Sequence, residues 1–336
     1  MKIIVPMAGM GKRMRPHTLT VPKPLIPIAG KPIVQRLVED IARVCGEAVD
    51  EVAFIIGRFG AEVEKSLVKI AESVGAKGTI YYQDEPLGTA HAILCAKDSL
   101  SGPLVVAFAD TLFKADFTLD SSVPGTIWVQ KVEDPKPFGV VKLNEQGQIT
   151  DFVEKPETFV SDLAIIGIYY FQDGEYLRNE LQYLLDNDIK DKGEYQLTNA
   201  LENMKNKGTI LVPGQVTEWL DCGNKDATVF TNQRYLEYLK ERGENLVADS
   251  AIITNSVLIE PVYIGENAVI TNSVVGPHTS IGSKSNVRDS CVSNSIVQTS
   301  ASVLNAVITD SMIGNFASVS SKAADLSVGD YNVLKV

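Results

Sequence analysis

The stretch Pro6-Met7-Ala8-Gly9-Met10-Gly11-Lys12-Arg13-Met14-Arg15-Pro16 comes directly after a short apolar run at positions 3–5. Glycines in such a turn let backbone N–H groups approach phosphate oxygens, because no Cβ atom stands in the way. Lys12, Arg13 and Arg15 add positive charge to the same loop. The glycine spacing matches neither the dinucleotide-binding fingerprint nor the Walker A loop. The stretch predicts a strand that ends in a cationic phosphate-binding turn, with an ordinary tight turn as the alternative.

A second cation follows close behind this loop. Lys23 stands between Pro22 and Pro24. Proline fixes its own φ and restricts the residue before it, so this segment presents one lysine from a stiff backbone. A solvated surface lysine is the alternative, but its nearness to the phosphate loop favours a functional lysine.

Segments typical of buried strands and of amphipathic helices alternate as far as Asp110. Val52-Ala53-Phe54-Ile55-Ile56 is continuously apolar, as a strand covered on both faces requires. The segment 32–44 instead carries apolar residues at helical spacing. This order predicts an α/β fold with a Rossmann-like mixed, mostly parallel sheet flanked by helices. Further strands are predicted at 79–83, 104–109, 126–132, 138–143, 149–153 and 165–171, and further helices at 61–74, 89–96, 174–185, 195–205 and 225–242.

The composition changes at about Asn245, where aromatic residues almost vanish and Val, Ile, Ser, Asn and Gly dominate. An apolar period of six residues begins there, in two series: Ala251, Val257, Tyr263, Val269, Val275, Ile281 and Val287, and Ile252, Leu258, Ile264 and Ile270. Such hexapeptide repeats predict a left-handed parallel β-helix, in which each apolar residue stacks on the one in the coil below. An antiparallel β-sandwich is the alternative and would show a two-residue period. We therefore expect one domain at 1–243 and a β-helix domain at 244–336.

The charge of the chain limits its partners. The formal net charge is −11, and an acidic surface repels nucleic-acid phosphates. The 4 cysteines form neither a CxxC pair nor a metal-ligand cluster, which is typical of reduced thiols. The N-terminus enters a strand without the apolar region of a signal peptide, and no apolar run reaches the length of a membrane span. We expect a cytoplasmic protein with no nucleic-acid or membrane partner.

Ten short motifs, taken in order, resemble the signature of the sugar-1-phosphate nucleotidyltransferases, a family that includes glucose-1-phosphate thymidylyltransferases. The resemblance covers the chain from Met1 to about Arg242, and many members also carry a β-helix tail. The motifs are Ala8-Gly9-x-Gly11-x-Arg13, Pro22-Lys23-Pro24-Leu25-x-Pro27, Lys31-Pro32, Gln83, Leu87-Gly88-Thr89-Ala90, Ala109-Asp110, Phe138-Gly139-Val140-Val141, Glu154-Lys155-Pro156, Ile166-Gly167-Ile168-Tyr169 and Trp219-Leu220-Asp221-Cys222-Gly223.

The resemblance implies a role for each matching position. The catalytic residues would be Arg13, which stabilises the departing pyrophosphate, Lys23, which bridges the two phosphates, Asp110, and Lys155, which grips the sugar phosphate. The substrate-binding residues would be Ala8, Gly9 and Gly11 at the triphosphate, Gln83 and Gly88 at the nucleobase, and Gly139, Glu154 and Gly167 at the sugar. Asp110 and Asp221 would bind Mg²⁺, the expected cofactor. Lys12 and Met10 depart from residues common in the family, which could alter the nucleotide preference.

These residue types suit the reaction that the family carries out. A sugar phosphate oxygen is already anionic at neutral pH, so it can attack the α-phosphorus without a strong general base. The difficulty is to bring two polyanions together, which cations and positioning overcome. Structural explanations stay open for some residues: Asp110 as a turn former, Glu154 and Lys155 as a surface ion pair, and His91 as a structural histidine.

The expected substrates are a nucleoside triphosphate and a sugar 1-phosphate, most simply glucose 1-phosphate with dTTP or UTP. The alternatives are a mannose-1-phosphate guanylyltransferase, a bifunctional uridylyltransferase and acetyltransferase that uses His278, the one histidine of the tail, and a non-catalytic nucleotide-sugar sensor subunit. We expect a homo-oligomer, because apolar faces and coil ends of a β-helix commonly pair with another subunit.

Overall fold

The computed structural model describes residues 1–114, 119–322 and 328. The chain forms two compact units, of which the first contains Met1–Pro27 and Lys31–Thr228 and the second contains Ile28–Gly30 and Val229–Val336. The domain limits expected from the sequence, 1–243 and 244–336, stay a prediction, and residues 323–327 and 329–336 of that second domain lie outside the described residues. None of the described helices combines the length and the apolar composition that a membrane span requires.

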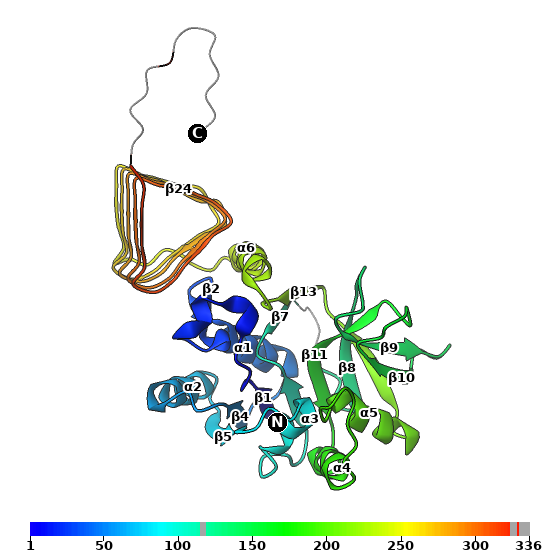
Figure 1. The fold of residues 1–336 in the computed structure, drawn as a ribbon. Helices are drawn as coiled ribbons and strands as arrows, with labels where there is room; N and C mark the ends of the chain where they lie inside the picture. The colour runs from blue at the N-terminus through cyan, green and yellow to red at the C-terminus, as the bar shows by residue number, and fades with distance from the viewer. Residues whose placement is uncertain (115–118, 323–327, 329–336) are drawn as a thin grey trace. The chain divides into compact units, whose positions relative to one another are not determined.

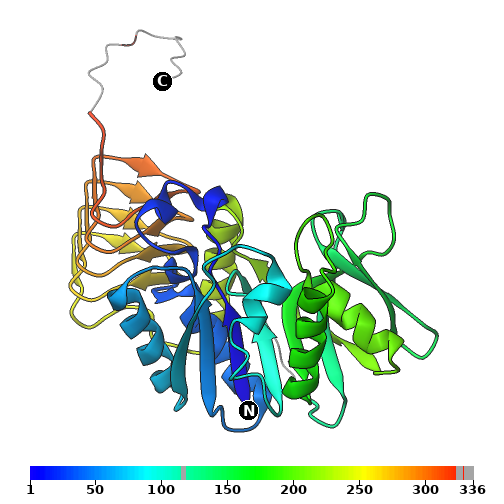
Figure 2. The same ribbon diagram turned by 60° about the horizontal axis from the view of Figure 1, so that its bottom comes forward.

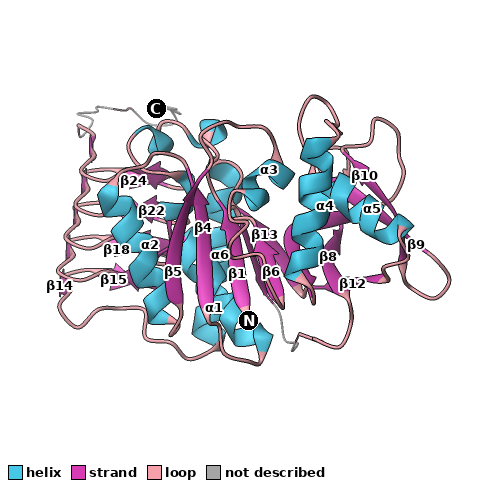
Figure 3. Cartoon of the chain, turned by 90° about the horizontal axis from the view of Figure 1, so that it is seen from below, coloured by secondary structure: helices cyan, strands magenta, loops and turns pink. Residues whose placement is uncertain are grey.

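The first unit is built on a nine-stranded sheet (Figure 1). In one half of it four strands run parallel in the order β6 (Leu104–Ala107), β1 (Lys2–Pro6), β4 (Glu51–Ile56) and β5 (Lys77–Tyr82), and Figure 3 shows β1, β4 and β5 side by side. Nearly every residue of β1, β4 and β6 is buried, as strands covered on both faces require. Because the four strands are parallel, their carboxyl ends meet at one edge.

The other half of the sheet is mostly antiparallel and is built around one long strand. That strand, β11 (Leu163–Phe171), pairs antiparallel with β6 and with two further strands. The remaining strands are β8 (Gly125–Lys131), β9 (Gly139–Leu143), β10 (Ile149–Glu154) and β12 (Leu211–Gln215). The predicted mixed sheet is confirmed: four parallel strands reach from β6 to the β5 edge, and beyond β6 every pairing is antiparallel except that of β12 with β8.

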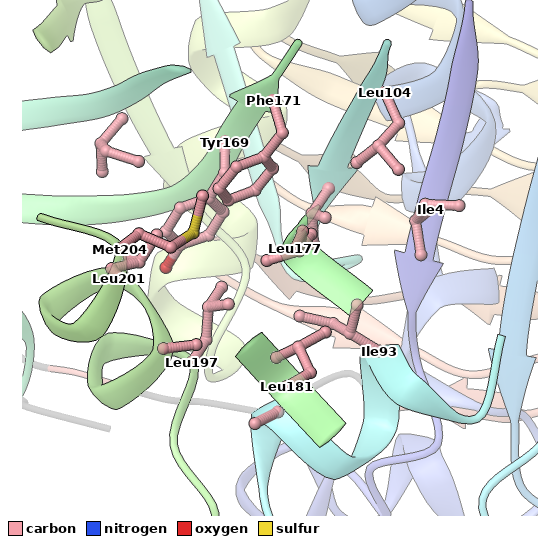
Figure 4. Packing of buried hydrophobic residues seen from close by; sticks show 14 of the residues in the cluster. Ile4, Ile93, Leu104, Tyr169, Phe171, Leu177, Leu181, Leu197, Leu201 and Met204 are labelled. Atoms are coloured by element: carbon pink, nitrogen blue, oxygen red, sulfur yellow. The ribbon is translucent and has the colours of Figure 1, made fainter. Parts of the chain in front are cut away.

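Helices cover both faces because alternate residues of a strand point to opposite sides. On one face, α3 (Thr89–Leu94), α4 (Gly174–Asp186) and α5 (Leu197–Asn206) pack their apolar residues against the sheet, as Figure 4 shows for Leu177 beside Leu104. On the opposite face, α1 (Ile33–Cys45) lies against Val105, the next residue of β6. The helix α2 (Ala61–Ser73) packs beside β5.

A separate two-stranded sheet was not predicted from the sequence. It consists of β7 (Thr111–Lys114), which follows β6 immediately, and β13 (Glu218–Asp221). Each strand has only four residues, too few for a two-residue period to be distinguished from chance. The pairing places Asp221 opposite Thr111, beside the end of β6.

The second unit holds most of α6 (Lys225–Glu241) and a left-handed parallel β-helix, which Figure 2 shows as a stack of coils. Three parallel sheets form its three faces, so the predicted β-helix is confirmed. Its strands are β14 (Ile252–Thr254), β15 (Val257–Leu258), β16 (Val262–Ile264), β17 (Val269–Thr271), β18 (Val274–Val275), β19 (Thr279–Ile281), β20 (Asn286–Arg288), β21 (Cys291–Val292), β22 (Ile296–Val297), β23 (Ser302–Leu304), β24 (Val307–Ile308), β25 (Met312–Ile313) and β26 (Ser318–Ser320).

One apolar residue from each face of each coil points into the β-helix and packs on the residue of the next coil. The inward columns are Leu258, Val275, Val292 and Ile308, then Ile264, Ile281, Val297 and Ile313, and then Ile270, Val287, Val303 and Val319. Neither of the two predicted six-residue series faces inward along its whole length, because Val257 of the first series and Ile252 of the second are each 57% exposed. A coil spans 17 or 16 residues, so the inward residue moves from one predicted series to the other after the first coil.

Candidate active site

A cleft of about 440 Å³ opens at the carboxyl ends of β1, β5 and β6 in the first unit. This edge is where open α/β sheets place their ligands. Most of the lining residues belong to the motifs of the sequence, and the full set is Pro6, Met7, Ala8, Gly9, Gly11, Lys12, Arg13, Lys23, Pro24, Gln83, Pro86, Gly88, Thr89, Ala92, Phe108, Ala109, Asp110, Glu194 and Gly223.

The glycine-rich loop after β1 closes onto the second lysine. Gly11 has φ +58°, and a Cβ atom there would lie 2.9 Å from the Cβ of Lys23. The Thr18 hydroxyl donates to the Gly11 carbonyl oxygen at 2.8 Å and fixes this turn. A short 3-10 helix, Lys12–Met14, then carries two of the cations, Lys12 and Arg13. Only glycine therefore allows the loop and Lys23 to approach this closely.

Lys23 is held against the carboxylate at the end of β6. It opens a 3-10 helix, Lys23–Leu25, directly after Pro22. Its ammonium nitrogen Nζ lies 2.9 Å from Oδ2 of Asp110. The lysine side chain is 10% exposed and that of Asp110 is 44% exposed, so the carboxylate remains accessible from the cleft.

Asp221 joins this group through the β7–β13 pairing. The backbone N–H of Cys222 donates to the Asp110 carbonyl oxygen at 2.9 Å, and the N–H of Gly223 donates to Oδ1 of Asp221 at 2.9 Å. A Cβ atom on Gly223 would lie 2.9 Å from Oδ2 of Asp221 and 3.3 Å from Nη2 of Arg13. The structure thus brings together Arg13, Lys23, Asp110 and Asp221, although Asp221 does not itself line the cleft.

The two aspartates fit a divalent cation. Burial raises the pKa of Asp221 above the ordinary value, and the negative charge of Asp110 raises it further, while Lys23 and Arg13 act in the opposite direction. A cation between the carboxylates would remove this repulsion. Within the described ranges, no group of three or more His, Cys, Asp or Glu residues gathers as a metal site. Two carboxylates suit Mg²⁺, which keeps several waters and takes further oxygens from substrate phosphates.

The opposite end of the cleft carries the residues predicted at the nucleobase. Gln83 follows β5 and Gly88 precedes α3, and both line the cleft. Gly88 has φ +115°, and a Cβ atom there would lie 2.4 Å from the carbonyl oxygen of Tyr195. The N–H of Tyr195 donates to the Leu87 carbonyl oxygen at 2.8 Å. The segment around Tyr195 is therefore fixed against the glycine turn.

A second group of predicted residues lies on β9 and β10, outside the residues that line the cleft. Gly139 pairs with Glu154, and a Cβ atom on Gly139 would lie 3.1 Å from the carboxylate oxygen Oε2. The same oxygen accepts a hydrogen bond from the Thr198 hydroxyl at 3.4 Å. Lys155 has φ +42°, and its Nζ lies 3.4 Å from Oε1 of Glu154. The predicted sugar residues Gly139, Glu154 and Lys155 thus form a cluster of their own.

Gly167 lies beside the cleft wall. Its carbonyl oxygen accepts from the N–H of Phe108 at 2.9 Å, and a Cβ atom on Gly167 would lie 3.4 Å from the Phe108 Cβ. Phe108 itself lines the cleft. Gly167 has φ +85°, a backbone angle at which a residue with a side chain would be strained. The pairing of β11 with β8 shifts register around this glycine, between Ile165 and Tyr169.

Sequence reasoning missed two polar residues near these groups. Glu194 lines the cleft and accepts a hydrogen bond from the Gln196 amide at 3.0 Å, and Thr198 contacts Glu154. The helix predicted at 195–205 begins two residues later, as α5 at Leu197, so the segment before it is a loop. The polar residues Glu194 and Gln196, just before the apolar residues of α5, were the sequence signal that could have indicated this loop. The hydrogen bond that holds this loop in place joins Tyr195 to Leu87 across more than a hundred residues, so it leaves no local pattern.

Known proteins similar to this chain belong to the family that its motifs resemble. The sequence profile of the nucleotidyl transferase family matches residues 2–237. The low-salt glycan biosynthesis nucleotidyltransferase Agl11 of Haloferax volcanii is 31% identical over 268 residues, which are 76% of this chain and 72% of that protein. The glucose-1-phosphate thymidylyltransferase of Streptomyces antibioticus is 29% identical over 288 residues, 79% of this chain and 78% of that one. The bifunctional protein GlmU of Methanococcus maripaludis is 29% identical, and this chain spans only 60% of its length.

Solved structures show the same architecture. A UDP-glucose pyrophosphorylase in complex with UDP-glucose superposes with a TM-score of 0.57 and 26% identity, over 70% of this chain and 98% of that one. A glucose-1-phosphate thymidylyltransferase structure from Bacillus anthracis superposes with a TM-score of 0.58 at 24% identity, over 69% and 93%, and so supports the fold alone. By its sequence profile and its relatives, this chain belongs to the nucleotidyl transferase family, with sugar nucleotidyltransferases among its relatives.

Proposed function

We propose that this chain transfers the nucleotidyl group of a nucleoside triphosphate to a sugar 1-phosphate and releases pyrophosphate. The observation that carries the proposal is the convergence of Arg13, Lys23 and Asp110 on one cleft, with Asp221 in contact with the same group. Two cations and two carboxylates at the end of a glycine-rich loop suit a reaction between two phosphates.

In the proposed reaction, a phosphate oxygen of the sugar 1-phosphate attacks the α-phosphorus in line. The bond from that phosphorus to the bridging oxygen breaks, and the electron pair leaves with pyrophosphate. No proton needs to be removed, because the attacking oxygen is already anionic. Lys23 would bind both reacting phosphates and lower their mutual repulsion, and Arg13 would stabilise the charge that develops on pyrophosphate.

Mg²⁺ held by Asp110 and Asp221 would supply further charge neutralisation at the triphosphate. Lys23 would then act alongside the cation rather than replace it, because it shares the Asp110 carboxylate. The backbone N–H groups of Gly9 and Gly11 would bind the phosphate chain.

The finer assignment is the substrate pair. We propose glucose 1-phosphate with dTTP or UTP, supported by the similarity to a glucose-1-phosphate thymidylyltransferase and to a UDP-glucose pyrophosphorylase structure. Glu154 and Lys155 would contact the sugar and its phosphate. A matrix of four nucleoside triphosphates against glucose, mannose and N-acetylglucosamine 1-phosphates, measured by pyrophosphate release, decides the pair. The best turnover with GTP and mannose 1-phosphate would contradict this assignment but not the reaction class.

The reaction itself is tested by pyrophosphate release that requires Mg²⁺ and both substrates. Lys23→Ala and Asp110→Ala should each lower turnover by at least about 100-fold, as expected for groups that stabilise transition-state charge. Lys131→Ala is a matched control, because the Lys131 side chain is 76% exposed and forms its ion pair with Asp162, at 2.9 Å, away from the residues that line the cleft. Near-normal turnover in both site variants would reject the reaction. Nucleotide binding without pyrophosphate release in the wild type would indicate a sensor subunit instead.

A further inference from the structure

Behind the nucleobase end of the cleft lies a histidine that the proposed reaction does not use. Gln83 lines the cleft, whereas His91, in the first turn of α3, is not among the lining residues. The backbone N–H of Gln83 donates to the Ile56 carbonyl oxygen at 2.9 Å, which anchors the residue at the end of β5. The side-chain amide of Gln83 lies between the cleft and the imidazole ring.

The contacts of the Gln83 amide decide which of its two ends is nitrogen. Nε2 lies 3.2 Å from the Gly88 carbonyl oxygen, and a carbonyl oxygen can only accept a hydrogen bond. The end that faces Gly88 must therefore be the NH₂ group. The second hydrogen of that group points to Nδ1 of His91, which lies 3.1 Å from Nε2.

Both hydrogens of the amide are thus engaged away from a ligand. Of residues 1–114 and 119–322, none donates a hydrogen bond to Oε1 of Gln83. Gln83 consequently offers the cleft an acceptor and no donor. Without a second acceptor such as Nδ1, the amide could rotate away from this orientation at little cost.

The ring of His91 must be neutral to accept this hydrogen bond. Nδ1 then carries the lone pair and Nε2 carries the proton. Burial lowers the pKa of His91 below its ordinary value, while the charge and the backbone of Glu85 oppose that shift. In the described part of the chain, Glu85 is the charged residue that acts on the ring. Directly after α3, the Sγ atom of Cys95 lies 4.0 Å from Nε2, and burial raises the pKa of that thiol, so it is neutral as well.

We propose that His91 is a positioning residue for nucleobase selection, which holds Oε1 of Gln83 toward the base. This inference rests on the proposed function for the placement of the base at Gln83. An acceptor at that position favours a ring N–H, such as N3–H of uracil or thymine or N1–H of guanine. Cytosine and adenine present a lone pair on the corresponding ring nitrogen, which an acceptor repels.

The test is the ratio of the dissociation constants for CTP and UTP, measured by calorimetry on the full chain, because binding does not require turnover. His91→Leu removes the acceptor and should lower the preference for UTP about 10-fold, the size expected when one oriented hydrogen bond is lost. His91→Asn can place Oδ1 where Nδ1 was and should keep the preference. Cys95→Ala is the matched control, because it changes only the Nε2 side of the ring.

A second readout is the pH dependence of the same ratio. In the wild type, lowering the pH from 7.5 to below the pKa of His91, which burial holds beneath its ordinary value, should reduce the UTP preference, because a protonated Nδ1 cannot accept. In His91→Asn the preference should stay constant. The ratio cancels the protonation of the triphosphate, which both ligands share. A wild type that binds UTP and CTP equally, or a His91→Leu variant that keeps the wild-type ratio at both pH values, would overturn the inference. A base preference that behaves as expected in a protein that releases no pyrophosphate would reject the proposed reaction and leave the inference standing.

Discussion

Nζ of Lys23 lies 2.9 Å from Oδ2 of Asp110, although 87 positions separate the two residues in the sequence. The contact joins the stiff proline-bracketed segment to the end of a central strand. It also places a cation beside a pair of carboxylates, since Asp221 lies next to Asp110 through β13. The charges of the site are therefore partly balanced before any substrate binds.

Asp221→Asn should stabilise the metal-free protein while lowering turnover. The raised pKa of Asp221 means that the folded state binds its proton more tightly than the unfolded state, whose aspartate titrates near 3.8. Stability from this group is therefore lost as the pH rises from that value through the raised folded pKa. The variant removes this loss, so its free energy of unfolding at pH 7 should rise by about 0.5–1 kcal/mol, the usual size for one stabilising substitution. Urea unfolding with EDTA measures the gain, and a less stable variant would contradict it.

Mg²⁺ should stabilise the wild type in the absence of nucleotide. A ligand that binds only the folded state at 100 times its dissociation constant adds about 2.7 kcal/mol. Thermal unfolding with and without Mg²⁺ checks this, and Asp221→Asn should lose most of the shift. Asp162→Asn is the control, since that carboxylate pairs with the exposed Lys131. An equal shift in Asp221→Asn would remove this residue from the cation site.

Gly11→Ala should impair the phosphate loop by displacing Lys23. The added Cβ atom would lie 2.9 Å from the Cβ of Lys23, in a backbone with φ +58°. Catalytic efficiency should fall about 100-fold, because small misplacements at a reacting centre are costly. Gly102→Ala separates strain from displacement, since Gly102 has φ +62° and open space around its Cβ position. If the two variants lose the same amount of stability and Gly11→Ala keeps the catalytic efficiency of Gly102→Ala, Lys23 has not been displaced.

Lys155→Ala should raise the KM for the sugar 1-phosphate by about 10-fold and leave the KM for the nucleoside triphosphate within about twofold, because one charge-assisted contact is worth roughly 1.5 kcal/mol. The Lys155 side chain is 52% exposed, so its removal should cost little stability. Steady-state kinetics with each substrate varied in turn make the distinction. Lys142→Ala, on the exposed end of β9, is the control. Equal rises in both KM values would place Lys155 elsewhere in the reaction.

Asn272 lies at the corner between β17 and β18 and should stabilise the β-helix by hydrogen bonds to the neighbouring coils. It has φ +50°, accepts from the Asn255 amide at 2.8 Å and donates to Asp289 at 3.0 Å. Asn272→Gly loses the two hydrogen bonds but keeps the backbone angle, whereas Asn272→Ala also forces alanine into the left-handed region. The alanine variant should therefore be about 1 kcal/mol less stable than the glycine variant. Urea unfolding of the full chain compares them, and equal stability would show that the angle carries no cost.

Features that depend on residues close together in the chain could be predicted before the structure was known. The glycine loop, the prolines around Lys23, the continuously apolar strands and the helix periodicities each act within one short window, and the structure has the corresponding elements. The hexapeptide repeat likewise predicted the β-helix, because every coil repeats the same local arrangement. Its register was not predicted, because inward spacings of five and six depend on how whole coils stack.

Which side chains share the site depends on contacts between segments that lie far apart in the chain. The pairing of β7 with β13 carries Asp221 to Asp110, and the turn at Tyr195 closes on Gly88. The contact of His91 with Gln83 also depends on where α3 packs. The physical reason is the same in each case: these groups meet through contacts between distant segments, whose energy depends on the packing of the whole sheet and leaves no period in the local sequence.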